Sequence, residues 1–241
     1  MYQHRREKGL KYRMCGRFAL YTSATKLQFF FGTRSALDLK PRYNIAPSQP
    51  VPVVLINEAG ERVFNVARWG WIPSWVRNPK DVKHPIHVEI ETAAIKPLYR
   101  RAFRTRRILI PADAFYEWEA TSSGKRPWLI RLKDGEPMGI GGLLERSRGP
   151  DGEILSFSLL TTEPNPLVAK IHDRMPVIIP PEDYSNWLDP AFTDVTRIQM
   201  IAKPYPERLM ESYLVSHEIN NPLHDSAELI AEKKGDTGTA K

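Results

Sequence analysis

The sequence predicts an α+β protein, a single compact domain around a bent, barrel-like antiparallel β-sheet with peripheral helices. The apolar runs are short and β-like, and they outnumber the helical patterns along the chain. Strands and helices do not alternate in the regular way that a parallel sheet needs. The 241 residues suffice to bury one core, and the 21 prolines lie scattered between the runs rather than in one linker.

The individual elements follow from apolar periodicity and from capping residues. The runs that predict strands cover residues 51–56, 63–69, 108–110, 114–118, 128–132, 138–144 and 155–161. The sequence NEAGE at 57–61 separates the first two runs and predicts a hairpin turn. The segments that predict helices are 26–31, which Thr22 or Ser23 can cap, 92–101, a stretch that Pro180 or Pro181 begins and Leu188 ends, and 192–202.

The composition excludes several classes of protein. With 41% hydrophobic and 26% charged residues the chain is typical of a soluble globular protein. No apolar run approaches the roughly 20 residues of a membrane span, and the basic start lacks the apolar stretch of a secretory signal. A single cysteine excludes an internal disulfide and a multi-cysteine zinc site. We therefore expect a cytoplasmic monomer with no membrane partner, no metal and no cofactor.

The net charge of +7 favours a polyanionic partner, although its distribution weakens that argument. Residues 1–13 form a basic leader that carries much of the charge, and we expect a misassigned start or a leader that is removed. We expect one domain over 14–230 and a disordered polar tail over 231–241. The stretch Lys96–Arg107 holds six basic residues and no acid, which suits phosphate contacts or a solvated face.

Three residues have the chemistry of a covalent site. If translation starts at Met14 and that residue is removed, Cys15 presents an α-amine and a thiol on adjacent carbons, which can close on an aldehyde as a five-membered thiazolidine. Glu117 shares a strand face with Phe115, where desolvation can raise the pKa of a carboxylate. His172 titrates near neutrality. Taken singly, each residue has an ordinary alternative: a buried thiol, a solvent-facing edge glutamate and a structural histidine.

Two other patterns are weaker. The spacing of His84 and His87 could serve a metal, but the intervening proline and the lack of cysteine partners make that site unconvincing. The tryptophans of RWGWIPSW, at 69, 71 and 75, could stack on bases, and at this spacing they are at least as often core residues.

Several segments together resemble the SRAP family, the SOS-response-associated abasic-site processing proteins, over nearly all of 14–230. The segments that carry the resemblance are MCGRFAL at 14–20, RYNIAP at 42–47, RWGWIPSW at 68–75, ET and KP at 91–97, LIPADAFYEW at 109–118, TTEPNPLVAKIHDRMPVI at 161–178 and VSHEINNP at 215–222. The resemblance implies the SRAP fold and a role in DNA repair. It also implies a partner, single-stranded DNA that contains abasic sites, and hence association with the nucleoid when on DNA.

The resemblance also implies residue roles. Cys15 would trap the ring-opened sugar aldehyde as a thiazolidine, Glu117 would assist ring opening and proton transfer, and His172 would assist imine formation and reversal. His87 stands where the family has an active-site asparagine. The DNA-binding positions implied are Arg17, Pro47, Trp75, Thr161 and Arg174.

The chain departs from the family pattern in ways that bear on activity. The family usually reads N-A-R-x-E-T where this chain has HVEIET, so that Glu89 replaces a DNA-contacting arginine and should repel phosphate. A retained leader would convert the amine of Cys15 to an amide and prevent thiazolidine formation. Two alternatives therefore stay open: a cysteine peptidase or hydrolase that uses Cys15 and His172, with lyase activity also compatible with the family, and a noncovalent single-stranded DNA-binding module.

Overall fold

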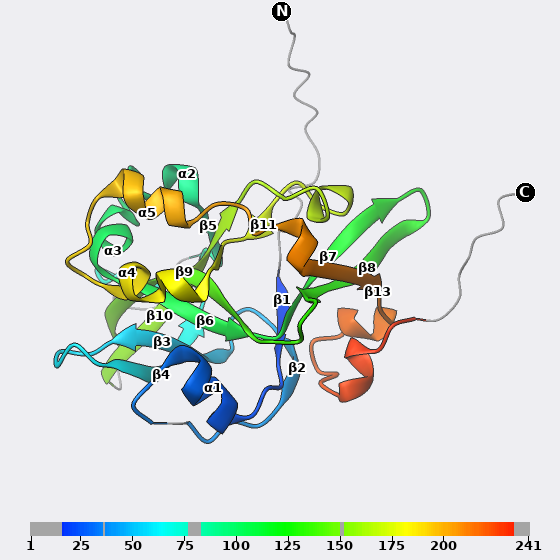
Figure 1. Cartoon of the computed structure of the whole chain (residues 1–241), viewed down its shortest axis with the longest axis horizontal. Helices are drawn as coiled ribbons and strands as arrows, with labels where there is room; N and C mark the ends of the chain where they lie inside the picture. Colours follow the sequence, from blue (N-terminus) through cyan, green and yellow to red (C-terminus); the bar gives the residue numbers. More distant parts are fainter. Residues whose placement is uncertain (1–15, 36, 77–82, 150–151, 234–241) are drawn as a thin grey trace, which may run out of the picture.

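The fold is built from two β-sheets that lie side by side in the middle of the molecule (Figure 1). The computed structural model describes residues 16–35, 37–76, 83–149 and 152–233, so the leader 1–13, Met14, Cys15 and residues 234–241 of the tail lie outside the described residues. No helix in these ranges is long and apolar enough to cross a membrane.

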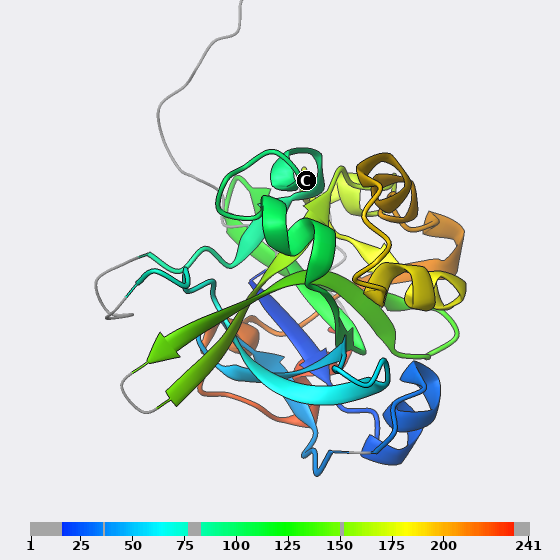
Figure 2. The same cartoon turned by 90° about the vertical axis from the view of Figure 1, so that its left-hand side faces the viewer.

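The first sheet closes into a barrel. Its strands follow the order β10 (Gly152–Thr162), β4 (Arg62–Trp69), β3 (Pro50–Ile56), β6 (Arg107–Ala112) and β9 (Met138–Gly149). Pairing of β9 with β10 completes the circle, and Figure 2 shows the β9–β10 ribbon extending beyond it. The short strands β5 (His87–Glu89), β11 (Met175–Pro176) and β12 (Ile178–Ile179) add to β10, β10 and β9.

The barrel-like sheet is therefore confirmed, with one correction to its strand directions. β10 runs parallel to both β4 and β5, so the sheet is mixed rather than antiparallel. The parallel β4–β10 pair is possible because a long crossover, which includes β5, β6 and β9, separates the two strands in sequence.

The second sheet is antiparallel and lies beside the barrel. Its order is β13 (Met210–Leu214), β8 (Gly124–Leu132), β7 (Ala114–Thr121), β1 (Arg17–Leu20) and β2 (Arg42–Ile45). In Figure 1 the β7–β8 hairpin projects to the right, and β1 stands between it and the barrel. All seven predicted strands are present, with bounds extended by one or more residues.

The helices are short, and one prediction among them was wrong. Residues 92–101 do not form one helix, because Pro97 lies between α2 (Ile90–Ala93) and α3 (Arg100–Thr105). The helix α1 (Ala24–Phe31) is capped by Ser23, as one of the two alternatives predicted. A 3-10 turn at Pro181–Asp183 leads into α4 (Tyr184–Leu188), and α5 (Val195–Ile201) starts later than expected because Asp194 caps it.

Two apolar clusters hold these sheets together. The larger fills the barrel, where the ring of Trp69 stacks on Phe157 with centroids 6.4 Å apart and Trp71 is also fully buried. The smaller joins the second sheet to the C-terminal segment through Ala19, Tyr116 and neighbouring residues. Trp69 and Trp71 are core residues, so of the three tryptophans in RWGWIPSW only Trp75, 69% exposed, is placed to meet a ligand.

Arg107 ends the basic stretch and has a structural role. Its guanidinium is buried and donates to five backbone carbonyls, those of Phe103, Arg104, Trp187, Asp189 and Phe192. Burial lowers the pKa of Arg107 to about 10, although the nearby Asp189 opposes the shift. The side chain thereby joins the ends of α3 and α4 to the barrel.

Replacing Arg107 with Met should lower the free energy of unfolding by about 3 kcal/mol, because the freed carbonyls of the helix ends lose their shared donor. Chemical denaturation followed by tryptophan fluorescence measures the change. Arg101→Met is the matched control, since Arg101 is exposed on α3, which precedes Arg107 in the chain, and it should change stability by less than about 0.5 kcal/mol. Equal effects of the two variants would contradict the structural role of Arg107.

Candidate active site

A pocket of about 960 Å³ opens where the barrel meets the second sheet. Its wall is formed by segments far apart in sequence: the start of β1, the loop after β2, the segment that leads into β5, the β7–β8 hairpin and two turns from the C-terminal half. The lining residues are Gly16, Arg17, Pro47, Ser48, Lys83, His84, Pro85, Ile86, His87, Trp118, Lys125, His172 and Asn220.

The pocket gathers many of the residues predicted from sequence. Arg17, Pro47, His87 and His172 line it, and so does Gly16, the residue covalently next to Cys15. The wall contains no carboxylate among the described residues, whereas it carries one arginine, two lysines and three histidines. The site is therefore electropositive, as a site for an anionic ligand would be.

The imidazole of His172 is largely buried and hydrogen-bonded at Nδ1. Its side chain is only 7% exposed, and Nδ1 accepts a hydrogen bond of 3.1 Å from the backbone N–H of Arg174. Burial lowers the pKa of His172 below its ordinary value; Asp173, whose carboxylate lies 3.0 Å from Nδ1 but is largely in water, opposes that shift. Nδ1 thus lies within hydrogen-bond distance of both the N–H of Arg174 and the carboxylate of Asp173, which leaves Nε2 as the ring nitrogen for a ligand.

Glu117 lies behind the pocket wall rather than in solvent. The side chain is 1% exposed, so the alternative of a solvent-facing edge glutamate was wrong. The alternation along β7 is confirmed, with Phe115 in the barrel core and Tyr116 in the smaller cluster. Arg17 on β1 pairs with Tyr116 on β7, so the next step of this register sets Gly16 opposite Glu117. A buried carboxylate thus lies beside the start of β1.

His87 and Glu89 share one face of β5 because alternate residues of a strand point the same way. The imidazole of His87 packs edge-on against Trp69, with ring centroids 6.2 Å apart. Both residues pair with β10, at Leu159 and Thr161. Among the described residues Glu89 makes no ion pair with Arg100 or Arg101. His84 also lines the pocket, and the described chain contains no group of three His, Cys, Asp or Glu side chains that could hold a metal.

Arg174 and Thr161 lie outside the pocket wall and contact each other. The guanidinium donates to both carboxylate oxygens of Glu91, at 3.0 and 2.8 Å, and to the backbone oxygen of Thr161 at 2.8 Å. Although burial by itself would raise the pKa of Glu91, the bonds from Arg174 hold it below its ordinary value. Glu91 therefore fixes Arg174 in one orientation. Trp75 also lies outside the pocket, on an exposed turn.

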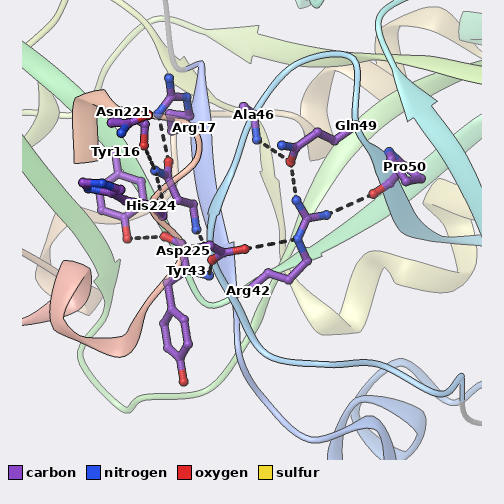
Figure 3. A network of polar contacts seen from close by, with 11 residues as sticks. Arg17, Arg42, Tyr43, Ala46, Gln49, Pro50, Tyr116, Asn221, His224 and Asp225 are labelled. Carbon is purple, nitrogen blue, oxygen red and sulfur yellow. Dashed lines mark hydrogen bonds and ion pairs between the residues drawn. The ribbon is translucent and has the colours of Figure 1, made fainter. Parts of the chain in front are cut away.

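Arg17 is held by the segment that closes the site. Its Nη1 donates to Oδ1 of Asn44 at 2.9 Å and to the backbone oxygen of Ile219 at 2.7 Å. Asn44 is buried, and its Nδ2 donates to the carbonyls of Ile219, Asn221 and His224. Figure 3 shows Arg17 beside Asn221 and His224 in this network.

Asp225 continues the same network at β2, beside Tyr43 and Arg42 (Figure 3). One oxygen accepts from the backbone N–H groups of Tyr43 and Asn44, and the other pairs with Arg42 at 3.6 Å. Tyr116 donates its hydroxyl to the carbonyl of Tyr43 at 2.7 Å. The C-terminal segment is thereby fixed against β2, and Asn220 is brought to the pocket wall.

Sequence reasoning missed several contributors. In the sequence Asn44 stands out only as part of RYNIAP at 42–47. No sequence pattern indicates that its side chain joins β1 to the C-terminal segment. Asn220 accepts from the indole N–H of Trp118 at 2.8 Å and lines the pocket, together with Lys83 and Lys125. Isolated polar residues in loops carry no periodic signal, so only the tertiary structure could identify them.

The fold and the motifs around this pocket define the chain as a member of the SRAP family. A family model described as SOS response associated peptidase (SRAP) matches residues 14–222, and the chain belongs to this family.

Known relatives cover nearly the same length. The chain is 37% identical to the abasic site processing protein YoqW of Bacillus subtilis, over 90% of this chain and 99% of that protein. It is 28% identical to the abasic site processing protein YedK of Escherichia coli, over 90% of this chain and 99% of that protein. A solved structure from Bacteroides thetaiotaomicron matches with a TM-score of 0.80 at 23% identity, covering 91% of this chain and 100% of that one. A solved structure of a phage-related protein from Bordetella bronchiseptica matches with a TM-score of 0.69 at 29% identity, covering 83% of this chain and 94% of that one.

The imidazole of His172 should titrate below pH 6.5, because its burial penalises the charged ring. Because the unfolded chain then binds more protons, stability should decrease as the pH falls below about 6.5. Asp173→Asn should lower the pKa of His172 further, since it removes the attraction that favours the charged ring. NMR of the histidine ring signals measures both values, and a pKa above 6.5 in the unmodified protein would contradict the burial argument.

Proposed function

We propose that this protein processes abasic sites in single-stranded DNA by forming a covalent thiazolidine through Cys15. The observation that supports the proposal most is the convergence of separate motifs on one electropositive pocket, with Gly16, His87 and His172 in its wall and Glu117 buried behind it. Relatives named abasic site processing proteins match the chain over 90% of its length.

The chemistry needs a free N-terminus on Cys15. The α-amine adds to C1′ of the ring-opened deoxyribose, and the resulting carbinolamine loses one water to give an imine. The thiolate then adds to the imine carbon, forming a C–S bond while the nitrogen takes up a proton. The net reaction joins protein to DNA and releases one water, and it uses the amine and the thiol as the two nucleophiles.

The neighbouring side chains suit the proton transfers of this sequence. Opening the sugar ring takes a proton from the hydroxyl at C1′ and returns one to the ring oxygen, and a buried carboxylate such as Glu117 can do both. Loss of water from the carbinolamine needs an acid, and His172 can serve once its ring has taken up a proton. The imidazolium can hold one N–H toward Asp173, 3.0 Å from Nδ1, and give the other proton from Nε2.

The binding side of the proposal rests on charge and on one exposed aromatic ring. Arg17 and the lysines of the wall suit phosphates, Arg174 is held near Thr161, and Trp75 offers a surface for base stacking. A splayed single strand reaches such groups more readily than a duplex does. Lyase and peptidase activities remain further hypotheses for the same residues.

Protein expressed from Met14 should form a stable adduct with single-stranded DNA that contains an abasic site, once the initiator is removed. Protein with residues 1–13 still attached should form none, because an amide nitrogen cannot condense to an imine. Denaturing electrophoresis with mass spectrometry of the product measures the adduct and the N-terminus together.

Two variants separate the roles of amine and thiol. Cys15→Ala and Cys15→Ser keep the amine, so any adduct should be an imine that survives only after reduction. A stable adduct from protein whose leader is demonstrably intact would contradict the thiazolidine mechanism. Cleavage of peptides without DNA would instead favour the peptidase, and a shift in native gels alone would favour a noncovalent binding module.

Restoring an arginine at Glu89 should strengthen DNA binding. Glu89→Arg replaces a repulsion with an attraction for phosphate, worth about 1 kcal/mol or roughly fivefold in affinity at a partly exposed site. Fluorescence anisotropy with a strand that carries a nonreactive abasic analogue measures the change. The control is Glu207→Arg, because Glu207 is exposed and far from β5 in sequence, and this variant should change DNA affinity less. Glu119→Arg is unsuitable as a control because Glu119 pairs with Arg126. Unchanged affinity in folded Glu89→Arg protein would refute the repulsion.

A further inference from the structure

The β7–β8 hairpin brings a lysine to the pocket that neither the motifs nor the comparisons single out. Lys125 is the second residue of β8, directly after Gly124 at φ +126°, where the hairpin turns. It lines the same pocket as Gly16 and His172, and Trp118 from the other strand of the hairpin also lines it. The hairpin therefore supplies one rim of the site.

The position of Lys125 has an electrostatic consequence for His172. Four influences act on the imidazole: burial lowers its pKa most, Asp173 and a backbone hydrogen bond at Arg174 raise it, and the charge of Lys125 lowers it. The other charged or titratable groups of the described wall are Arg17, Lys83, His84 and His87, and all of them are basic. An anion that enters the pocket therefore meets Lys125 and His172 together.

We propose that Lys125 binds a backbone phosphate of the DNA strand beside the abasic nucleotide and thereby couples DNA binding to proton uptake at His172. The inference rests on the proposed function and adds a residue and a form of control to it. The β7–β8 hairpin and β5 lie on different sides of β1 (Figure 1), so the hairpin rim would hold the strand away from Glu89, which is unfavourable for phosphate.

The coupling follows from charge neutralisation. In the free protein the ammonium group disfavours a second positive charge on His172. When a phosphate pairs with Lys125, that repulsion is offset, and the imidazole takes a proton from solvent more readily. His172 then enters the reaction better able to donate the proton that loss of water from the carbinolamine requires.

The experiment compares Lys125→Met and Lys125→Arg with Arg126→Met. Arg126 is the matched control, because it is the next residue of β8, points to the opposite face and pairs with Glu119 at 2.8 Å. The probe is a single strand that carries a tetrahydrofuran abasic analogue, which cannot form the adduct. Affinity is measured over a range of salt concentrations, and the pKa of His172 is measured by NMR with and without the strand.

The proposal expects two changes in Lys125→Met. The slope of log affinity against log salt should decrease by about 0.7, the value for one lost phosphate contact on a single strand. The pKa of His172 should rise in the free protein, and the further rise on adding DNA should shrink. Lys125→Arg should retain both the slope and the DNA-dependent rise, and Arg126→Met should leave both unchanged.

The outcomes separate this inference from the function on which it rests. If the unmodified protein binds the probe and Lys125→Met has the same slope and the same DNA-dependent pKa rise, the role of Lys125 is overturned while abasic-site processing stands. If protein with a free Cys15 forms no adduct with abasic DNA and binds no probe, the proposed function fails and the phosphate role fails with it. Thermal unfolding checks that each variant is folded.

Discussion

The arrangement of the site depends on one buried carboxamide. Asn44 is 1% exposed, and its amide satisfies three carbonyls of the C-terminal segment while its oxygen accepts from Arg17. A primary amide suits this position because it is both donor and acceptor without carrying charge into the interior. An aspartate there could accept from Arg17 but could not donate to the carbonyls, and a leucine could do neither. The strands β1 and β2 and the turn around Asn220 are therefore fixed by the same side chain.

The distribution of charge follows a second constraint. Cations form the wall of the pocket, whereas the carboxylates lie behind or beside it: Glu117 in the interior and Glu91 on Arg174. Glu91 fixes a guanidinium that would otherwise sample several rotamers, which lowers the entropy lost when an anion binds. The buried position of Glu117 removes its charge from contact with an incoming phosphate while leaving it beside the start of β1. One site can thus combine an acid–base group with an anion-binding surface.

Local sequence predicted much of the fold and less of the site. The seven predicted strands were in the right places because a short apolar run marks a strand directly, and the face of Glu117 followed from alternation along β7. The strands β1, β2, β5, β11, β12 and β13 were not predicted. The burial of Glu117 could not be predicted from this alternation, because it depends on the residues of β1 and the barrel that cover the side chain. The single helix expected over 92–101 failed because the rigid φ of Pro97 outweighed the apolar spacing around it. The parallel pairing of β4 with β10 depends on a crossover whose path no local pattern describes.

The hydrogen bond from Arg17 to the carbonyl of Ile219 joins residues 202 positions apart in the chain. This separation determines the order in which the parts of the site are synthesised. At ribosomal rates of about 5–20 residues per second, roughly 10–40 s pass between the synthesis of β1 and that of its partner. During this interval a nascent chain carries its N-terminal residues without the wall that Asn220 and the C-terminal turn provide. The completed pocket is thus a property of the finished polypeptide, and a chain terminated early would expose its N-terminus without the site.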